Sequence, residues 1–216
     1  MHWDNDKPSE SGAENSTAYA RIVAAARRVF FANGFRRVTM DELAGELGMS
    51  KKTLYEHFSS KAALVEAAII DKFRTVDHEL EQITSGCSSD FIGTLRRLLA
   101  FIQQEMGEIQ PPFQRDIKQQ PELFIHVETR RRELVQRYFG RLISEGRKAG
   151  LVREDISAEI MTEIILAAVE RIMTPSKMSE LEITPKAGFS AIVSVILQGV
   201  ITRKTVNNDS AKSSNG

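Results

Sequence analysis

Apolar residues recur at intervals of three and four along almost the whole chain, which is the spacing of one face of an α-helix. The strict alternation of apolar and polar residues that marks a half-buried strand does not occur between turn signals. With 42% hydrophobic and 27% charged residues, the 216-residue chain has enough apolar material for a sizeable core. The sequence therefore predicts an all-α protein of one or two domains.

Capping residues and glycines indicate where individual helices begin and end. Thr39, followed three residues later by Glu42, forms a capping box, and Ser50 is an N-cap. Gly34 and Gly48 are expected to end helices in the left-handed conformation. About nine helices are expected in all, and eight of them are placed over residues 17–33, 40–47, 51–57, 61–83, 91–106, 121–149, 157–173 and 185–204.

Residues 40–58 have the pattern of two short helices that cross at a steep angle through a three-residue turn. Such a crossing needs a small residue where the helices meet, here Ala44, and a glycine with positive φ in the turn, here Gly48. Leu43 and Phe58 contribute to a small core between the helices. The pattern predicts a helix-turn-helix, although other helical hairpins share small residues at the crossing.

The chain divides into four predicted segments. Residues 1–15 and 206–216 are polar, so they are predicted to be disordered tails with nothing to bury. Residues 16–62 are predicted to form an N-terminal three-helix domain with the helix-turn-helix. Residues 63–205 are predicted to form a larger C-terminal helical domain.

The net charge of the chain is zero, yet residues 16–61 contain eight basic and four acidic residues, a local excess of four positive charges. Lys51 and Lys52 occupy the first turn of one short helix and Lys61 the first turn of the next, where the helix dipole disfavours cations. A polyanion reverses that sign, because its phosphates meet ammonium groups and free backbone N–H groups together. The alternative is a solvated lysine pair on a helix surface.

The segment "TMDELAGELGMSKKTLYEHFSSKAALVEAAI" resembles the DNA-binding domain of the tetracycline-repressor (TetR) family of bacterial regulators. The resemblance covers about residues 22–70 and includes the family-typical "TLYxHFxSK" from Thr53 to Lys61; beyond it the resemblance is only architectural. It implies a sequence-specific DNA-binding transcriptional regulator. Most typically this is a repressor that binds a palindromic double-stranded DNA operator as a homodimer and is released or modulated by a small-molecule effector. Activation in place of repression stays open.

The resemblance implies that the two short helices and the first turn of the next helix approach DNA. Lys52 and Thr53 point toward base edges, and the sequence leaves open which of the two reads a base. Tyr55 is expected at a phosphate, with core packing against the first helix as the alternative, and Glu56 is expected to point away from DNA. The predicted DNA-binding set is Thr39, Ser50, Lys51, Lys52, Thr53, Tyr55, His57 and Lys61.

The last two predicted helices are apolar over most of their circumference, so one buried face does not account for them. Paired with their copies in a second chain they would form a four-helix interface, whereas a monomer with a large internal core is the alternative. The predicted interface residues are Ile160, Ile164, Ala168, Phe189, Ile192, Val193, Ile196 and Val200.

The resemblance also implies an effector cavity in the C-terminal domain, which would then be a regulatory and dimerisation domain. Aromatic residues and methionines at helical spacing form ordinary core more often than they line a cavity. The candidate lining residues are Phe101, Met106, Phe124, His126 and Met161.

Motifs of enzymes and cofactor sites are missing from the sequence, so neither catalysis nor a cofactor is expected. Glu122 and His126 lie one helical turn apart and could share a metal with Glu128 or His78, but a solvated helix face explains them better, and no metal is expected. Cys87 is the single cysteine and is interpreted as a linker residue. A protein-binding adaptor is the remaining alternative function.

Two stretches near the ends of the sequence indicate where in the cell the protein is expected. The first residues, "MHWDNDKPSESGAENS", are polar and acidic and lack the apolar region of a signal peptide. The longest apolar run, "SAIVSVILQGVI", is shorter than the roughly twenty residues that span a bilayer. The sequence therefore predicts a cytoplasmic protein with no membrane partner.

Overall fold

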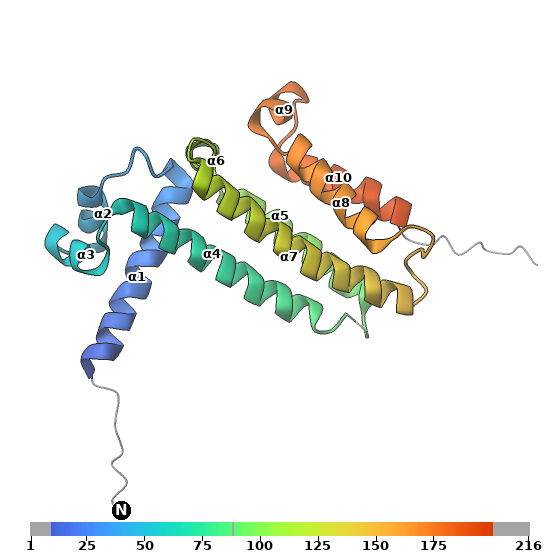
Figure 1. Cartoon of the computed structure of the whole chain (residues 1–216), viewed down its shortest axis with the longest axis horizontal. Coiled ribbons are helices and arrows are strands. Elements are labelled where there is room, and N and C mark those ends of the chain that lie inside the picture. The colour runs from blue at the N-terminus through green and yellow to red at the C-terminus, as the bar shows by residue number, and fades with distance from the viewer. Residues whose placement is uncertain (1–9, 88, 201–216) are drawn as a thin grey trace, which may run out of the picture.

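The computed structural model describes residues 10–87 and 89–200, which form ten α-helices and no strand (Figure 1). The prediction of an all-α protein is therefore confirmed for this part of the chain. The predicted tail at 206–216 and residues 1–9 lie outside the described residues. The helices are α1 (Glu10–Asn33), α2 (Met40–Leu47), α3 (Lys51–His57), α4 (Lys61–Thr84), α5 (Phe91–Glu108), α6 (Pro111–Lys118), α7 (Pro121–Lys148), α8 (Ala158–Ile172), α9 (Pro175–Glu180) and α10 (Pro185–Val200).

Two short helices, α6 and α9, were not among those placed from the sequence, so the expectation of about nine helices is corrected to ten. Both begin with a proline, Pro111 and Pro175. In the sequence, "QPPF" suggests only a break, but proline fits the first helical position because the N–H it lacks would have no partner there. Helix α1 also begins at Glu10, so residues 10–15 are helical and do not belong to the predicted tail.

The first hydrophobic core joins α1, α2 and α3 to α4 and α6. Phe30 and Leu43 are fully buried in it, together with Leu64 of α4. Phe113 and Ile117 of α6 belong to the same cluster. The core is therefore continuous across the predicted domain boundary between residues 62 and 63, because α4 and α6 cover the apolar side of the three-helix unit.

The second hydrophobic core lies between α4, α5, α7 and α8, farther from α1. Leu95, Leu142 and Met161 are buried there, one from each of α5, α7 and α8. Helix α10 packs against α5 and α8, which places it with α8 at the end of the molecule opposite α2 and α3 (Figure 1). None of the described helices combines the length and the apolar character needed to cross a membrane.

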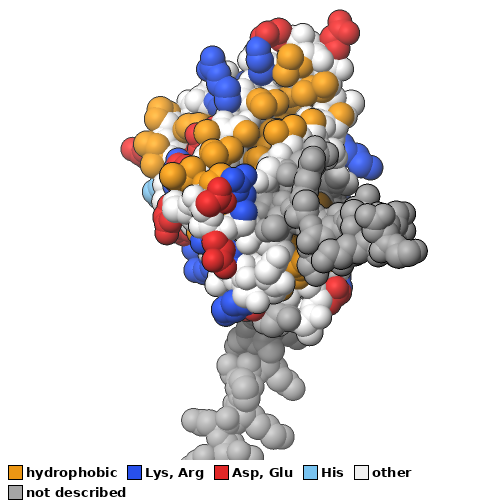
Figure 2. All heavy atoms as spheres, turned by 90° about the vertical axis from the view of Figure 1, so that its right-hand side faces the viewer, with side chains coloured by type: hydrophobic (Ala, Val, Ile, Leu, Met, Phe, Trp, Pro, Cys, Tyr) orange, Lys and Arg blue, Asp and Glu red, His pale blue; other side chains and the backbone are white. Residues whose placement is uncertain are grey.

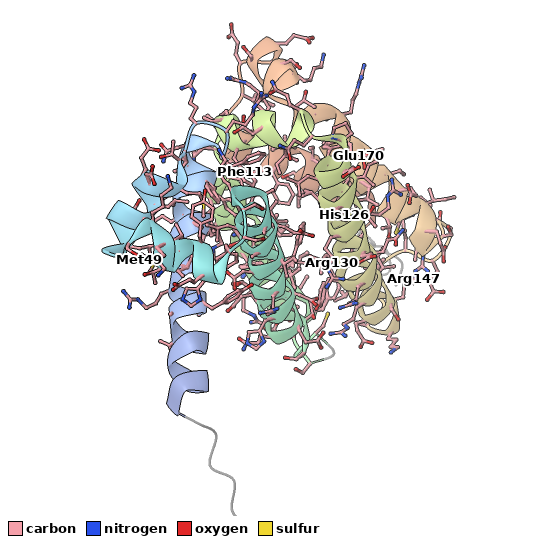
Figure 3. All side chains as sticks on the ribbon, turned by 60° about the vertical axis from the view of Figure 1, so that its left-hand side comes forward. Met49, Phe113, His126, Arg130, Arg147 and Glu170 are labelled. Atoms are coloured by element: carbon pink, nitrogen blue, oxygen red, sulfur yellow. The ribbon has the colours of Figure 1, made fainter. Side chains whose placement is uncertain are left out.

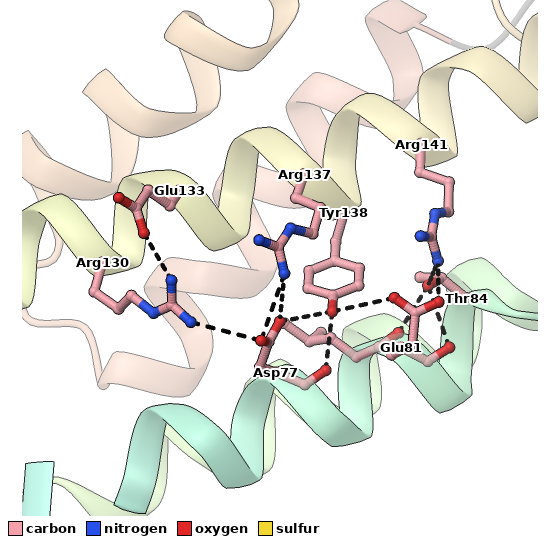
Figure 4. Close-up of polar contacts among 9 residues, drawn as sticks. Asp77, Glu81, Thr84, Arg130, Glu133, Arg137, Tyr138 and Arg141 are labelled. Atoms are coloured by element: carbon pink, nitrogen blue, oxygen red, sulfur yellow. Dashed lines mark hydrogen bonds and ion pairs between the residues drawn. The ribbon is translucent and has the colours of Figure 1, made fainter. Parts of the chain in front are cut away.

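Polar contacts fix α4 beside α7 (Figure 4). The Tyr138 hydroxyl donates to the Asp77 carboxylate at 2.7 Å, and Arg141 donates to Glu81 at 2.8 Å. Arg137 also pairs with Asp77, at 3.1 Å. Burial and the hydrogen bond to Asp77 raise the pKa of Tyr138 to about 12, so the phenol stays protonated and keeps donating at neutral pH.

Candidate nucleic-acid interface

Helices α2 and α3 form the predicted helix-turn-helix with its capping residues in place. The Thr39 hydroxyl accepts from the Glu42 N–H at 3.2 Å, and the Glu42 carboxylate accepts from the Thr39 N–H at 2.7 Å, which completes the capping box. The Glu42 carboxylate also accepts from the Thr39 hydroxyl at 3.0 Å, and the hydrogen bonds from the Thr39 N–H and hydroxyl lower the pKa of Glu42. Gly48 ends α2 with a φ of 65°, and the Ser50 hydroxyl caps α3 by accepting from the Thr53 N–H at 3.0 Å.

Helix α3 buries one face and exposes the other. Leu54 is fully buried, and the Phe58 ring that follows the helix stacks on Tyr19 of α1 with centroids 5.0 Å apart. Lys52 is exposed, and Tyr55 is 43% exposed. Tyr55 is therefore not part of the buried core. With α2, α3 forms one end of the molecule (Figure 1), so its exposed face is free to meet a groove.

The three predicted lysines have different surroundings. The Lys51 ammonium group lies 2.9 Å from the Asp41 carboxylate, and that hydrogen bond raises the pKa of Lys51. The Lys61 ammonium group donates to the carbonyl of Val38 at 3.0 Å, so it supports the loop between α1 and α2. The Lys52 ammonium group makes no hydrogen bond or ion pair with the described residues. Of the three, Lys52 is the one with its charge free for an external partner.

Most of the other basic residues counted in residues 16–61 are engaged within the chain. Arg27 pairs with Asp71 at 2.9 Å, and Arg28 pairs with Glu46. Arg36 donates to Gln119. The basic residues of this segment without a polar contact to the described chain are Arg21, Arg37 and Lys52.

Arg37 is a candidate DNA-binding residue that the sequence pattern did not single out. It is exposed in the loop between α1 and α2, two residues before the Thr39 cap, and it makes no polar contact with described residues. Lys61 bonds the carbonyls of Arg36 and Val38 on either side of it. The only sequence signal was the "RR" at positions 36 and 37, and only the structure shows that the first arginine is engaged and the second is not.

The remaining predicted DNA-binding residues surround the start and the end of α3. The hydroxyl groups of Ser50 and Thr53 lie 2.8 Å apart, so each already has one polar partner. Thr53 and His57 are half-buried, whereas Thr39 and Ser50 are exposed. The structure thus brings the eight predicted residues to one end of the molecule, while their contact with DNA stays a prediction.

The candidate effector residues are spread over different parts of the molecule. Met161 is buried in the second core, Phe101 packs against that core, and Phe124 packs against the first. His126 is exposed on α7 (Figure 3), and the side chain of Met106 lies outside the described residues. A surface pocket of about 450 Å³ contains none of these five and is lined by Gly140, Ile143, Ser144, Arg147, Lys148, Glu154 and Ala158.

The predicted interface residues on α8 and α10 divide into exposed and covered groups. Ile160 is 55% and Ile164 is 51% exposed, as an interface requires, while Ala168 and Ile196 are half-buried. The side chain of Val200 lies outside the described residues. The prediction is corrected for three residues that their own chain already buries, because α10 turns this side toward α5 and α8. These residues are Phe189, Ile192 and Val193.

Two other sequence interpretations concern metal and thiol chemistry. Glu122 and His126 lie on α7, and the described residues contain no group of three or more side chains placed to hold a metal ion. Cys87 lies in the connection between α4 and α5, as the interpretation as a linker residue has it, and its side chain is buried in the second core. Burial raises the pKa of the Cys87 thiol, which keeps it protonated at neutral pH.

Comparison with known proteins shows which family the helix-turn-helix resembles. Residues 22–68 match the sequence model of the bacterial regulatory proteins, tetR family, and these residues include α2, α3 and the turn between them. The regulator TtgR of Pseudomonas putida is 33% identical over 87 residues, which cover 40% of this chain and 41% of TtgR. The chain thus matches about two fifths of the length of the first curated relatives.

Solved structures extend the similarity to the whole fold. A TetR-family regulator from Agrobacterium tumefaciens superposes with a TM-score of 0.67 at 18% identity, covering 87% of this chain and 100% of that chain. The SmeT–triclosan complex superposes with a TM-score of 0.62 at 17% identity, covering 87% of this chain and 93% of that chain. Residues 22–68 thus match the tetR family of bacterial regulatory proteins, and the described helices have the fold of solved TetR-family regulators.

Proposed function

We propose that the chain binds a palindromic DNA operator as a homodimer and represses transcription until a small-molecule effector releases it. The observation that carries this proposal is the exposed face of α3, which includes Tyr55 and the free ammonium group of Lys52. Ser50 caps this helix, and Leu54 buries its opposite face in the core. Free cations and a rigid helix are what major-groove recognition needs. Lys52 is long enough to reach guanine O6 or N7, and Thr53 offers a methyl group and a hydroxyl.

The homodimer is supported by apolar surface at the end of the molecule opposite α3. Ile160 and Ile164 lie one helical turn apart on α8 and are both about half exposed, and Val195 of α10 is 73% exposed. Figure 2 views the molecule from the side where α8 and α10 lie, and hydrophobic side chains form a band on this face. A two-fold pairing through this face would present two α3 helices for major grooves about 34 to 36 Å apart.

The effector is supported more generally by the family. SmeT, whose fold is similar, was solved as a complex with triclosan, and it is the repressor of a Stenotrophomonas maltophilia multidrug efflux pump. In this chain α4 passes from the first core to the second, so a ligand that displaces α4 in the second core would also move the helix-turn-helix.

The test begins with selection of duplexes from a random-sequence pool by the full-length protein. The selected duplex is then used in gel shifts at several salt concentrations, with a scrambled duplex of the same length beside it. We expect tight, salt-sensitive binding that favours the selected duplex. The double variant Lys51→Ala/Lys52→Ala should lose most of this affinity, and its dependence on salt should weaken by about 0.9 in log–log slope for each phosphate contact removed.

The matched control is Lys186→Ala, which removes one exposed lysine from α10 at the other end of the molecule. It should bind both duplexes as the wild type does. A wild-type protein that shows no sequence preference and no salt-sensitive binding would overturn the proposed function in favour of a protein-binding adaptor.

A further inference from the structure

The ion pair between Asp41 and Lys51 joins the first turns of the two helices of the helix-turn-helix. Asp41 is the second residue of α2 and Lys51 the first residue of α3, and their charged groups are 2.9 Å apart. The side chains are 64% and 57% exposed, so solvent and a bound polyanion both reach the pair. The contact therefore lies on the surface that the proposed function turns toward DNA.

Helix electrostatics explain why this pair forms within the protein. The positive end of the α2 dipole stabilises the Asp41 carboxylate, while the same end of α3 disfavours the Lys51 ammonium group. The first turn of α3 contains no acidic residue of its own. Asp41 supplies from α2 the negative charge that the start of α3 lacks, and a DNA phosphate would supply the same charge to the same ammonium group.

The other acidic residues of α2 have different partners. Glu42 is held in the capping box by Thr39, and Glu46 pairs with Arg28 of α1. Among the described contacts of α2, the carboxylate that reaches α3 is that of Asp41. Glu46 is thus a natural comparison, because it has the same charge on the same helix but is paired away from α3.

We propose that Asp41 competes with DNA phosphates for Lys51 and so lowers the affinity of the protein for DNA. The inference rests on the proposed function. Binding to non-operator DNA depends almost wholly on phosphate contacts, so a cation already held by Asp41 contributes little to it. Binding to the operator adds base contacts from the exposed face of α3, and because these do not involve Asp41, the competition lowers affinity for the operator as well.

The test compares Asp41→Asn with Glu46→Gln in gel shifts on the selected and the scrambled duplex. We expect Asp41→Asn to raise affinity for the scrambled duplex about fivefold, the effect of freeing one exposed ion pair. Its log–log salt slope should steepen by about 0.9, because Lys51 then displaces a counterion without an acid beside it. Affinity for the selected duplex should rise by a similar factor, because its base contacts do not involve Asp41.

The variant Lys51→Gln supplies the second measurement. Its loss of affinity for the scrambled duplex should be larger in the Asp41→Asn background than in the wild type, because the lysine contributes fully only when Asp41 is neutral. Thermal unfolding of each variant checks that the fold is kept.

Three outcomes would overturn the inference. Equal effects of Asp41→Asn and Glu46→Gln on DNA affinity would show that the net charge of the protein, and not the pair of Asp41 with Lys51, sets the affinity. Unchanged binding by Asp41→Asn, with normal wild-type binding to the selected duplex, would remove the role of Asp41 and leave the proposed function standing. A wild-type protein without salt-sensitive binding to either duplex would remove both.

Discussion

The Phe113 ring of α6 packs against the Phe31 ring of α1, with the ring centroids 4.4 Å apart. Beside them the backbone N–H of Gln110 donates to the carbonyl of Phe31 at 3.0 Å, and the Asp116 carboxylate accepts from the N–H of Arg36 at 2.9 Å. A helix that follows the predicted domain boundary by almost fifty residues is therefore part of the core under the helix-turn-helix. The two parts of the chain are expected to unfold together.

Replacement of Phe113 with alanine tests this continuity. Phe113→Ala should lower the free energy of unfolding by about 3 to 5 kcal/mol, because it leaves a cavity between α1 and α6. Urea unfolding followed by far-UV circular dichroism measures the change, and Ile125→Ala, on the exposed side of α7, should stay within about 0.5 kcal/mol of the wild type. A small effect of Phe113→Ala would show that the helix-turn-helix is stable without α6.

Two glycines with positive φ predict different costs for the same substitution. Gly48 has a φ of 65° and open space where a Cβ would lie, so Gly48→Ala should cost only the backbone strain of about 1 to 2 kcal/mol. Gly34 has a φ of 79°, and a Cβ there would lie 2.6 Å from Asp116 Oδ2 and 3.2 Å from the backbone of Pro112. Gly34→Ala should therefore be the more destabilising change in thermal unfolding. Equal melting temperatures would contradict the close approach of α6.

Tyr138 predicts a dependence of stability on alkaline pH. Its pKa is about 12 in the fold and about 10 when unfolded, so its contribution is complete below about pH 10 and is lost as the pH rises toward 12. At neutral pH, Tyr138→Phe should lower the free energy of unfolding by about 1 to 3 kcal/mol, since the hydrogen bond to Asp77 is lost. Urea unfolding at increasing pH should show this difference shrink above about pH 10. A constant difference would contradict the raised pKa.

Substitutions of Lys61 and Lys52 should both lower DNA affinity but should differ in their effect on stability. Lys61→Met removes the hydrogen bond to the Val38 carbonyl, so both the melting temperature and the affinity for DNA should fall. Lys52→Ala removes an exposed side chain without a polar partner in the described chain, so stability should change by less than about 0.5 kcal/mol while DNA affinity falls. Thermal unfolding and gel shifts on the same samples separate the two. If Lys61→Met lowered affinity alone, Lys61 would be a direct phosphate ligand.

Substitution of the exposed Ile164 tests whether the protein forms a dimer through α8. Ile164→Glu places a charge on the exposed apolar side of α8 and should convert a dimer into a monomer at micromolar concentration. Sedimentation equilibrium measures the mass, and Ile70→Glu on α4, where the isoleucine is equally exposed, should leave it unchanged. A wild-type protein that sediments as a monomer would contradict the proposed pairing through α8 and α10.

The bounds of α2 and α3 were predicted correctly because their caps are local. Thr39 bonds Glu42 three residues away, and Gly48 ends its helix through its own φ. Helix α6 was missed because its prolines also fit a simple break in the chain, while the helix is packed in place by the contact of Phe113 with Phe31 of α1. A cap can be seen in four consecutive residues, whereas the sequence does not show which residues far apart in the chain meet in space.

The sequence by itself determined the helical fold class, the capped helix-turn-helix and the local excess of positive charge, because each depends on neighbouring residues. Only the tertiary structure decided which charges are free. Lys51 is held by Asp41, Lys61 by the Val38 carbonyl, and Lys52 by no described residue. Likewise it decided which apolar side of α10 is buried in its own chain. Lysines in a sequence are equivalent, but an ammonium group forms its ion pair with whichever carboxylate the packing of helices brings within about 3 Å.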